Sequence, residues 1–186
     1  MTRSARVLPA LKGKPMTVLP SPPDPYLKPL PQITEFNRPF FEAVNDHRFV
    51  VPRCEECGRF NWIPYPACRT CLSDELVWTE VSGQATLYTF SVVHRGPGAY
   101  DASVPYIVAM GELAEGPCLV LATLVGSAPD SLRIGRRLQI AYQDIPSEET
   151  TVYHWVAVPA NSAAEDRWAV SLGTPAGVRN AVDERY

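Results

Sequence analysis

The chain has 186 residues, of which 46% are hydrophobic, with a formal net charge of −3 and a pI of about 5.6. Because nucleic-acid binders usually carry a basic face, this acidic balance argues against nucleic acid as the partner. The sequence contains no run of about 18 apolar residues and no apolar stretch after Arg3 and Arg6, so we expect no membrane span, no secretory signal and a cytoplasmic location.

Residues 1–33 predict an extended, proline-rich arm. Eight prolines fall in this segment, and proline both fixes φ and removes a backbone hydrogen-bond donor. We therefore expect neither helix nor sheet here. The arm is either a simple linker or a strap that lies across a partner.

Residues 34–46 predict a short helix with one apolar face. Phe36, Phe40 and Val44 recur at four-residue spacing, and Phe41 lies beside them. This face packs either on the protein's own core or on another subunit. The helix has two candidate N-cap residues, Thr34 and Asn37.

Residues 47–80 contain two C-x2-C pairs, made by Cys54, Cys57, Cys68 and Cys71. This spacing lets both thiolates of a tight turn reach one metal ion at about 2.3 Å. Four thiolates complete a tetrahedral shell and leave no open position, which indicates one structural zinc ion per chain. Iron in a rubredoxin-type site has similar ligands and is the alternative. Strands are expected on both sides of the cysteines, at 49–53 and 75–81.

The loop between the cysteine pairs is rich in aromatic residues. Its side chains either pack between the cysteine module and the next domain or form an interface with a partner. Combined with the helix face, this gives five candidate partner-contact residues: Phe36, Phe40, Phe41, Trp62 and Tyr65. Three nearby arginines, Arg53, Arg59 and Arg69, are expected to offset the negative charge of zinc with four thiolates; the alternative is that they contact an acidic partner.

Residues 81–158 show a repeated two-residue alternation typical of β-strands. Five strands are expected, at 83–94, 106–113, 118–125, 136–145 and 151–158. In the first, Leu87 and Thr89 are expected to face one way and Tyr88 and Phe90 the other. Five short strands with short turns suggest a small closed barrel of the OB type, although periodicity alone does not separate it from other small barrels. Residues 159–186 predict a C-terminal tail without a firm element.

No catalytic site is expected in this chain. His47, His94 and His154 are scattered and none lies in a nucleophile motif. Cys118 lies in an apolar strand, which is typical of a buried, unreactive thiol. We therefore predict no catalytic residues and no activity for the chain alone.

Several sequence blocks occur together in a specific order: N-R-P-F-F-E-A (37–43), R-C-E-E-C-G (53–58), Y-P-A-C-R-T-C (65–71) and W-T-E-V-S-G-Q-A-T-L-Y-T-F (78–90). In these blocks the sequence resembles a family long catalogued as domain of unknown function thirty-five, over roughly residues 34–158. The resemblance implies a mainly β fold: an N-terminal helical arm at 34–46, a rubredoxin-like zinc ribbon at 47–80 and a five-stranded OB-fold barrel at 81–158.

The resemblance also implies a function. Members of this family resemble non-catalytic accessory subunits of acyl-CoA enzymes. Their partners are thiolase-like or lipid-transfer-type aldolase subunits, as in steroid side-chain degradation, or MaoC-like hydratases. The chain would then be a required subunit of a carbon–carbon-bond enzyme complex and would help to hold the acyl-CoA. The alternative is a single-stranded nucleic-acid binder, because OB-folds and zinc ribbons both support that role.

Overall fold

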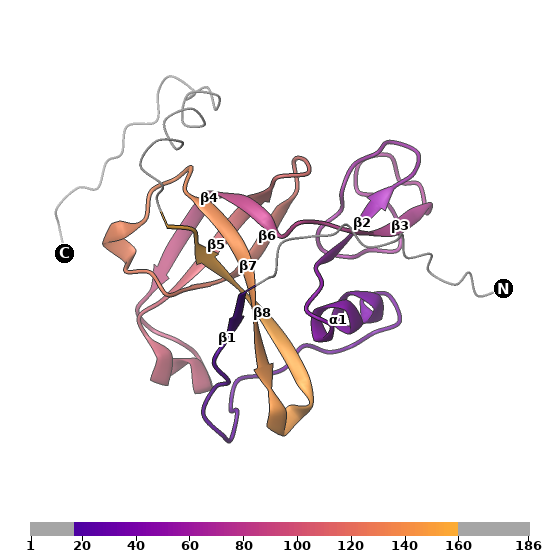
Figure 1. The fold of residues 1–186 in the computed structure, drawn as a ribbon. Coiled ribbons are helices and arrows are strands. Elements are labelled where there is room, and N and C mark those ends of the chain that lie inside the picture. Colours follow the sequence, from indigo (N-terminus) through magenta and orange to yellow (C-terminus); the bar gives the residue numbers. More distant parts are fainter. Residues whose placement is uncertain (1–16, 160–186) are drawn as a thin grey trace.

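The computed structural model describes residues 17–159 (Figure 1). The expectations for residues 1–16 and for the tail at 160–186 lie outside the described residues. The elements are β1 (Thr17–Leu19), α1 (Arg38–Asn45), β2 (Val50–Cys54), β3 (Leu76–Glu80), β4 (Gln84–Val93), β5 (Tyr106–Leu113), β6 (Leu119–Val125), β7 (Arg137–Ile145) and β8 (Thr150–Ala157). Three short 3₁₀ turns lie at Gly98–Ser103, Pro129–Ser131 and Pro146–Glu148.

Five of the strands close into a barrel. They pair in the order β4-β5-β6-β8-β7, and β7 pairs back with β4. All neighbours are antiparallel except β6 and β8, which are parallel at Leu124 and Trp155. Trp155 is fully buried and donates its Nε1–H to the Val120 carbonyl at 3.2 Å. The expected fold class, a five-stranded OB-type barrel beside a zinc ribbon, is confirmed.

The alternation of β4 is interrupted by a β-bulge at Tyr88. The register with β5 shifts between Leu87 and Thr89, and Tyr88 is exposed. Leu87 is buried, whereas Thr89 is exposed and Phe90 is half-buried. The expectation that Leu87 and Thr89 share a face is therefore wrong, because the extra residue of a bulge moves every later side chain to the other face.

Helix α1 lies between the ribbon and the lower end of β8 (Figure 1). It begins at Arg38, later than expected, with Pro39 in its first turn. Asn37 occupies the N-cap position, but its side chain makes no cap hydrogen bond. Its Oδ1 instead accepts the Thr34 backbone N–H at 2.6 Å, and its Nδ2 donates to the Gln32 carbonyl at 3.0 Å. Asn37 thus fixes the loop that leads into the helix.

An aromatic cluster joins the helix, the ribbon and the barrel. The Phe40 ring from α1 lies edge-on to four neighbours at centroid distances of 5.1 to 5.5 Å: Phe41, Phe49, Trp62 and Tyr153. Edge-to-face contacts of this kind stabilise a pair by about 0.5–1.5 kcal/mol beyond area burial. Phe40 is 2% exposed, so the helix face packs on the protein's own core.

Polar contacts at the end of α1 reinforce the same junction. His47 donates its Nε2–H to the Asp144 carboxylate on β7 at 2.8 Å, and the Thr151 hydroxyl donates to the same oxygen at 2.7 Å. Arg48 donates twice to Glu80 of β3, at 2.7 and 3.0 Å. These bonds join residues 7 to 97 positions apart and fix how the chain passes from helix to ribbon.

The proline-rich arm contains one strand. Residues Thr17–Leu19 pair in parallel with residues 141–143 of β7, although the proline content predicted no sheet in this segment. The three residues lie between Pro15 and Pro20 and all retain their backbone N–H, so they can pair with a free strand edge. β4 pairs with β7 only at residues 137–139 and leaves that edge open.

No helix among residues 17–159 is long and apolar enough to cross a membrane. The expected boundaries between arm, helix, ribbon, barrel and tail stay predictions.

Candidate metal centre

The four cysteines of the two C-x2-C pairs lie together at the end of the ribbon. All four Sγ atoms are within 4.8 Å of one another. The Cys54–Cys71 and Cys57–Cys68 sulfur distances are 3.5 and 3.6 Å. A tetrahedral zinc ion with Zn–S bonds of about 2.3 Å separates its sulfurs by about 3.8 Å. The four residues therefore suit a zinc ion with a closed sulfur shell, as expected from the sequence.

Each pair is held by a tight turn that ends in a left-handed residue. In the first turn the Gly58 N–H donates to the Cys54 carbonyl at 2.9 Å, and Gly58 has φ +70°. In the second, the Leu72 N–H donates to the Cys68 carbonyl at 3.0 Å, and Leu72 has φ +64°. Gly58 adopts this conformation freely, whereas Leu72 pays a steric cost of about 1–2 kcal/mol.

Asn61 connects the two turns and was not singled out by the sequence analysis. It is 3% exposed. Its Nδ2 donates to the Arg59 carbonyl at 3.1 Å, and its Oδ1 accepts the Arg69 backbone N–H at 2.9 Å. A buried amide with both ends bonded sets the spacing between the two turns. The only sequence feature that could have pointed to Asn61 is its position as a polar residue within an aromatic loop.

The pKa values of Cys68 and Cys71 are shifted in opposite directions. Backbone N–H donors of Cys71 and Thr70 lower the pKa of Cys68 to about 6, and the Thr70 N–H lies 3.4 Å from that sulfur. The Ser73 N–H lowers the pKa of Cys71, but desolvation and the other three sulfurs outweigh it and raise this pKa to about 12. A bound divalent cation would offset the repulsion between neighbouring thiolates, because each cysteine binds the metal in its deprotonated form.

Two of the three arginines near the site contact the ribbon loops, and the expected charge compensation stays a prediction. Arg53 donates to the Gly58 carbonyl at 3.2 Å, and its guanidinium lies 5.9 Å from the Phe60 ring centre. The Arg69 guanidinium lies 5.0 Å from the ring centre of Tyr65. These side chains brace the ribbon loops, so any effect on the charge of a zinc–thiolate centre acts through space.

The five candidate partner-contact residues separate into three groups by their exposure. Phe36 and Tyr65 are 57% and 49% exposed and stay predictions for partner contact. Phe41 and Trp62 are half-buried in the aromatic cluster. Phe40 is buried, so its assignment to a partner surface is corrected: the ring lies among four aromatic neighbours of its own chain.

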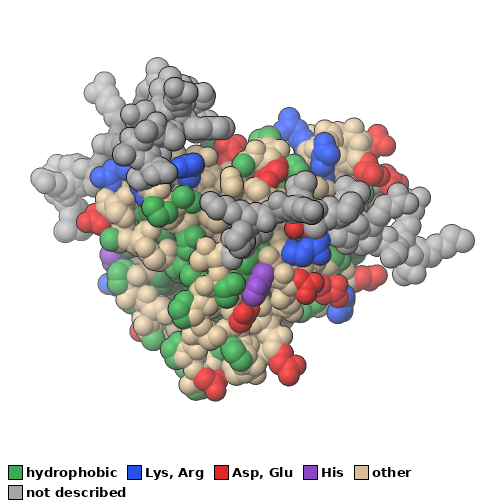
Figure 2. Space-filling view, in the orientation of Figure 1, with side chains coloured by type: hydrophobic (Ala, Val, Ile, Leu, Met, Phe, Trp, Pro, Cys, Tyr) green, Lys and Arg blue, Asp and Glu red, His purple; other side chains and the backbone are tan. Residues whose placement is uncertain are grey.

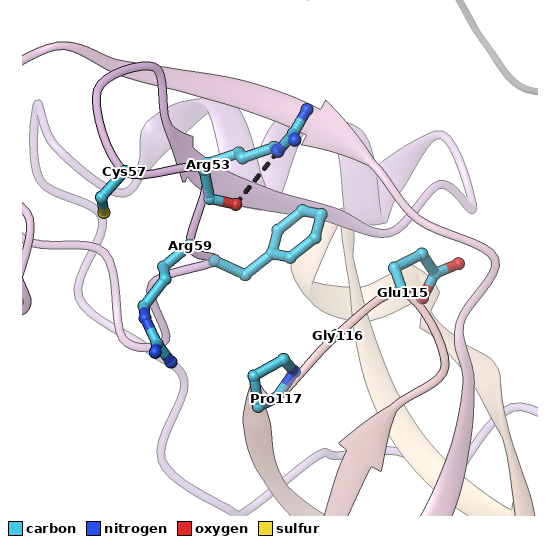
Figure 3. Close-up of a pocket in the computed structure, with 8 residues that line it drawn as sticks. Arg53, Cys57, Arg59, Glu115, Gly116 and Pro117 are labelled. Carbon is cyan, nitrogen blue, oxygen red and sulfur yellow. Dashed lines mark hydrogen bonds between the residues drawn. The ribbon is translucent and has the colours of Figure 1, made fainter.

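An open groove of about 540 Å³ lies between the first cysteine turn and the β5–β6 turn (Figure 3). The ribbon contributes Arg53 and Arg59, and the barrel turn contributes Glu115, Gly116 and Pro117. The two arginine side chains point in opposite directions, and Cys57 points away from the barrel turn (Figure 3). The groove therefore carries both signs of charge: two arginines and the Glu115 carboxylate, which accepts the Ser82 backbone N–H.

The remaining candidate reactive groups are separated from one another. Cys118 is 4% exposed, and burial raises the pKa of its thiol to about 11, so it is the expected unreactive thiol. His94 is exposed at the end of β4. His47 bonds to Asp144 and His154 to Gln143. None of these contacts joins a histidine to a hydroxyl or thiol nucleophile.

Comparison with known proteins agrees with this architecture. The family model "ChsH2, rubredoxin-like zinc ribbon domain" matches residues 41–77, and "ChsH2, C-terminal OB-fold domain" matches residues 78–143. Together the two models cover more than half of the chain.

Three related proteins are informative. A "Probable enoyl-CoA hydratase alpha subunit" of Thermomonospora curvata is 36% identical over 72% of this chain and 41% of its own length. A "DUF35 domain-containing scaffold protein" of Methanocaldococcus jannaschii is 29% identical over 52% of this chain and 68% of its own. A chain of the "Ltp2-ChsH2(DUF35) aldolase" structure is 31% identical with a TM-score of 0.61, covering 69% of this chain and 98% of that chain.

The present chain thus spans less than half of the Thermomonospora relative but nearly all of the solved aldolase chain. The match extends through both the cysteine module and the barrel. The chain belongs to the ChsH2-type, or DUF35, family of zinc-ribbon and OB-fold proteins.

Proposed function

We propose that this chain is a non-catalytic accessory subunit of an acyl-CoA-processing enzyme. The partner we favour is a thiolase-superfamily or lipid-transfer-type aldolase subunit, as in steroid side-chain degradation, and a MaoC-like hydratase is the other partner class. The chain stabilises the complex and contributes to holding the acyl-CoA. This function suits a cytoplasmic protein.

The observation that carries the proposal is the 31% identity to a chain of the "Ltp2-ChsH2(DUF35) aldolase" across 98% of that chain. The hydratase alpha subunit of Thermomonospora supports the same broad class of partner. The site supports it as well: a closed sulfur shell offers no position for substrate, and the histidines contact no nucleophile among the described residues.

Two surface features are consistent with contact to a partner and an acyl-CoA. Phe36 and Tyr65 expose aromatic rings at the helix and the ribbon loop, and aromatic side chains are frequent anchors in interfaces. The groove between ribbon and barrel has Arg53 and Arg59 as well as Glu115 in its lining, and its two arginines are the groups that could contact the phosphates of an acyl-CoA.

The charge distribution disfavours the nucleic-acid alternative. Four arginines and seven acids lie between residues 81 and 158. Figure 2 shows acidic and basic side chains interspersed over the ribbon side rather than gathered into one basic face. Single-stranded nucleic-acid sites combine stacking aromatic side chains with a basic groove. The face in Figure 2 lacks the basic groove.

The test is co-expression with the thiolase-like or MaoC-like proteins encoded beside this chain, followed by size-exclusion chromatography. We expect the two chains to elute together in a fixed ratio. The matched variant is Phe36→Ala, which should weaken co-elution without changing the fold. Separate elution from every such neighbour would refute the proposal.

A further inference from the structure

The arm at residues 17–33 is attached to the edge of β7 and to the 3₁₀ turn at Gly98–Ser103. Only three residues pair as a strand, from Thr17 opposite Ala141 to Leu19 opposite Gln143. The Gln143 side chain then donates from Nε2 to the Pro20 carbonyl at 2.8 Å. Further along, the Lys28 ammonium lies 5.5 Å from the Tyr100 ring centre. The arm is thus attached by a short strand and a few polar contacts.

The arm buries little apolar surface. Val18 is 50% exposed and Leu27 is 73% exposed, and no residue of 17–33 belongs to the buried core cluster. Segments with few buried apolar contacts open locally at a small fraction of the global unfolding free energy. The arm can therefore detach while the barrel stays folded.

His154 of β8 lies next to this attachment. Its Nε2–H donates to the Gln143 Oε1 at 3.1 Å, and Gln143 is the residue that holds Pro20. The His154 Nδ1 is buried and has no hydrogen-bond partner. One amide side chain thus connects the state of the imidazole to the position of the arm.

The groups around His154 oppose a positive charge on it. From the arm, the charged neighbour is Lys28. From β7 the polar neighbour is Gln143, and β6 pairs with β8 through the apolar residues Leu124 and Val125. Among residues 17–159 no carboxylate is paired with the ring. Burial and, secondarily, Lys28 lower the pKa of His154 from 6.5 to about 4.

Protonation of the ring would place an N–H at Nδ1 where no acceptor is present. It would also place a second positive charge near Lys28, whose ammonium lies over the Tyr100 ring. Both penalties vanish when the arm leaves and water reaches the ring. Neutral His154 therefore favours the attached arm, and protonated His154 favours the detached arm.

We propose that residues 17–33 form a strap that is closed over β7 and β8 while His154 is neutral and that detaches when His154 takes up a proton. Detachment frees the β7 edge at residues 141–143. The unpaired backbone groups of such an edge can accept a strand from another chain. This switch does not depend on the identity of the enzyme partner.

The strap can be followed by hydrogen–deuterium exchange with mass spectrometry on the zinc-loaded full chain. Peptides that cover residues 17–19 and 141–143 report the strand pairing. The pKa of His154 is about 4 with the arm attached and 6.5 for a free imidazole. The equilibrium constant for arm opening should therefore rise by up to about 30-fold between pH 7.5 and 5.0. Exchange rates are compared after correction for the intrinsic pH dependence of amide exchange. Peptides from 54–71 report any loss of metal in acid.

Two variants separate this mechanism from a general loosening in acid. His154→Gln keeps an amide donor for Gln143 but does not titrate, so the increase in opening should disappear. Lys28→Met keeps the imidazole and removes the neighbouring charge, so the increase should become smaller. Equal protection of both peptides at the two pH values in the wild type, or a wild-type-sized increase in either variant, would overturn the proposal.

Discussion

Replacement of Phe40 by alanine tests whether the helix face packs on the protein's own core. The side chain is 2% exposed and its ring touches four aromatic rings at 5.1 to 5.5 Å. Buried Phe→Ala substitutions cost about 3–5 kcal/mol, and four edge-to-face contacts place this site near the upper end. A loss of about 4 kcal/mol is a large share of a typical stability of about 5–15 kcal/mol.

The assay is equilibrium urea unfolding of the zinc-loaded chain, followed by tryptophan fluorescence and far-ultraviolet circular dichroism. With a slope of about 2 kcal/mol per molar urea, Phe40→Ala should lower the midpoint by roughly 2 M. The matched control is Phe36→Ala, in the segment just before α1. The Phe36 side chain is 57% exposed, so this change should alter the free energy of unfolding by less than about 0.5 kcal/mol. Equal midpoint shifts for the two variants would refute the packing described for α1.

Cys57→Ser should reduce the zinc content from one ion per chain to almost none by elemental analysis and raise hydrogen exchange in the ribbon, because three thiolates leave the shell open; full zinc retention would contradict the site. Gly111→Ala should cost about 1–3 kcal/mol in urea unfolding, because its Cβ would lie 2.8 Å from the Trp155 Cζ2. Hydrogen bonds from His47 and Thr151 lower the pKa of Asp144, so its stabilisation is present above the unfolded pKa of about 3.9 and is lost as pH falls through the lower folded value. Asp144→Asn should therefore reduce stability at pH 7 by less than about 1 kcal/mol, and the difference from wild type should shrink below about pH 4 in thermal unfolding curves; a pH-independent difference would show that the carboxylate charge plays no part.

Local patterns in the sequence predicted the elements well, and long-range contacts explain what they missed. The cysteine spacing and the two-residue alternation led to the ribbon and the barrel strands, since both signals lie within a few residues. The sequence did not predict the β-bulge at Tyr88, because the two-residue alternation continues on each side of it. Strand Thr17–Leu19 needs the free edge of β7, more than 120 residues away. The bond between His47 and Asp144 joins residues 97 positions apart and leaves no local signature.

The location of Phe40 illustrates the same limit. The four-residue spacing identified an apolar helix face, but it did not decide whether that face packs against the protein's own core or against another subunit. Only the position of Tyr153 on β8 and Trp62 in the ribbon loop decides this, because both rings close over Phe40. Exposed Phe36, one turn earlier, remains available for a partner.

The most direct test of an accessory role is acyl-CoA turnover by three samples: the purified chain, its co-encoded aldolase or hydratase partner, and the two combined. We expect no turnover by the chain alone and a higher rate for the combination than for the partner alone. Turnover by the isolated chain, or a partner whose rate and assembly are unchanged by adding it, would contradict the account.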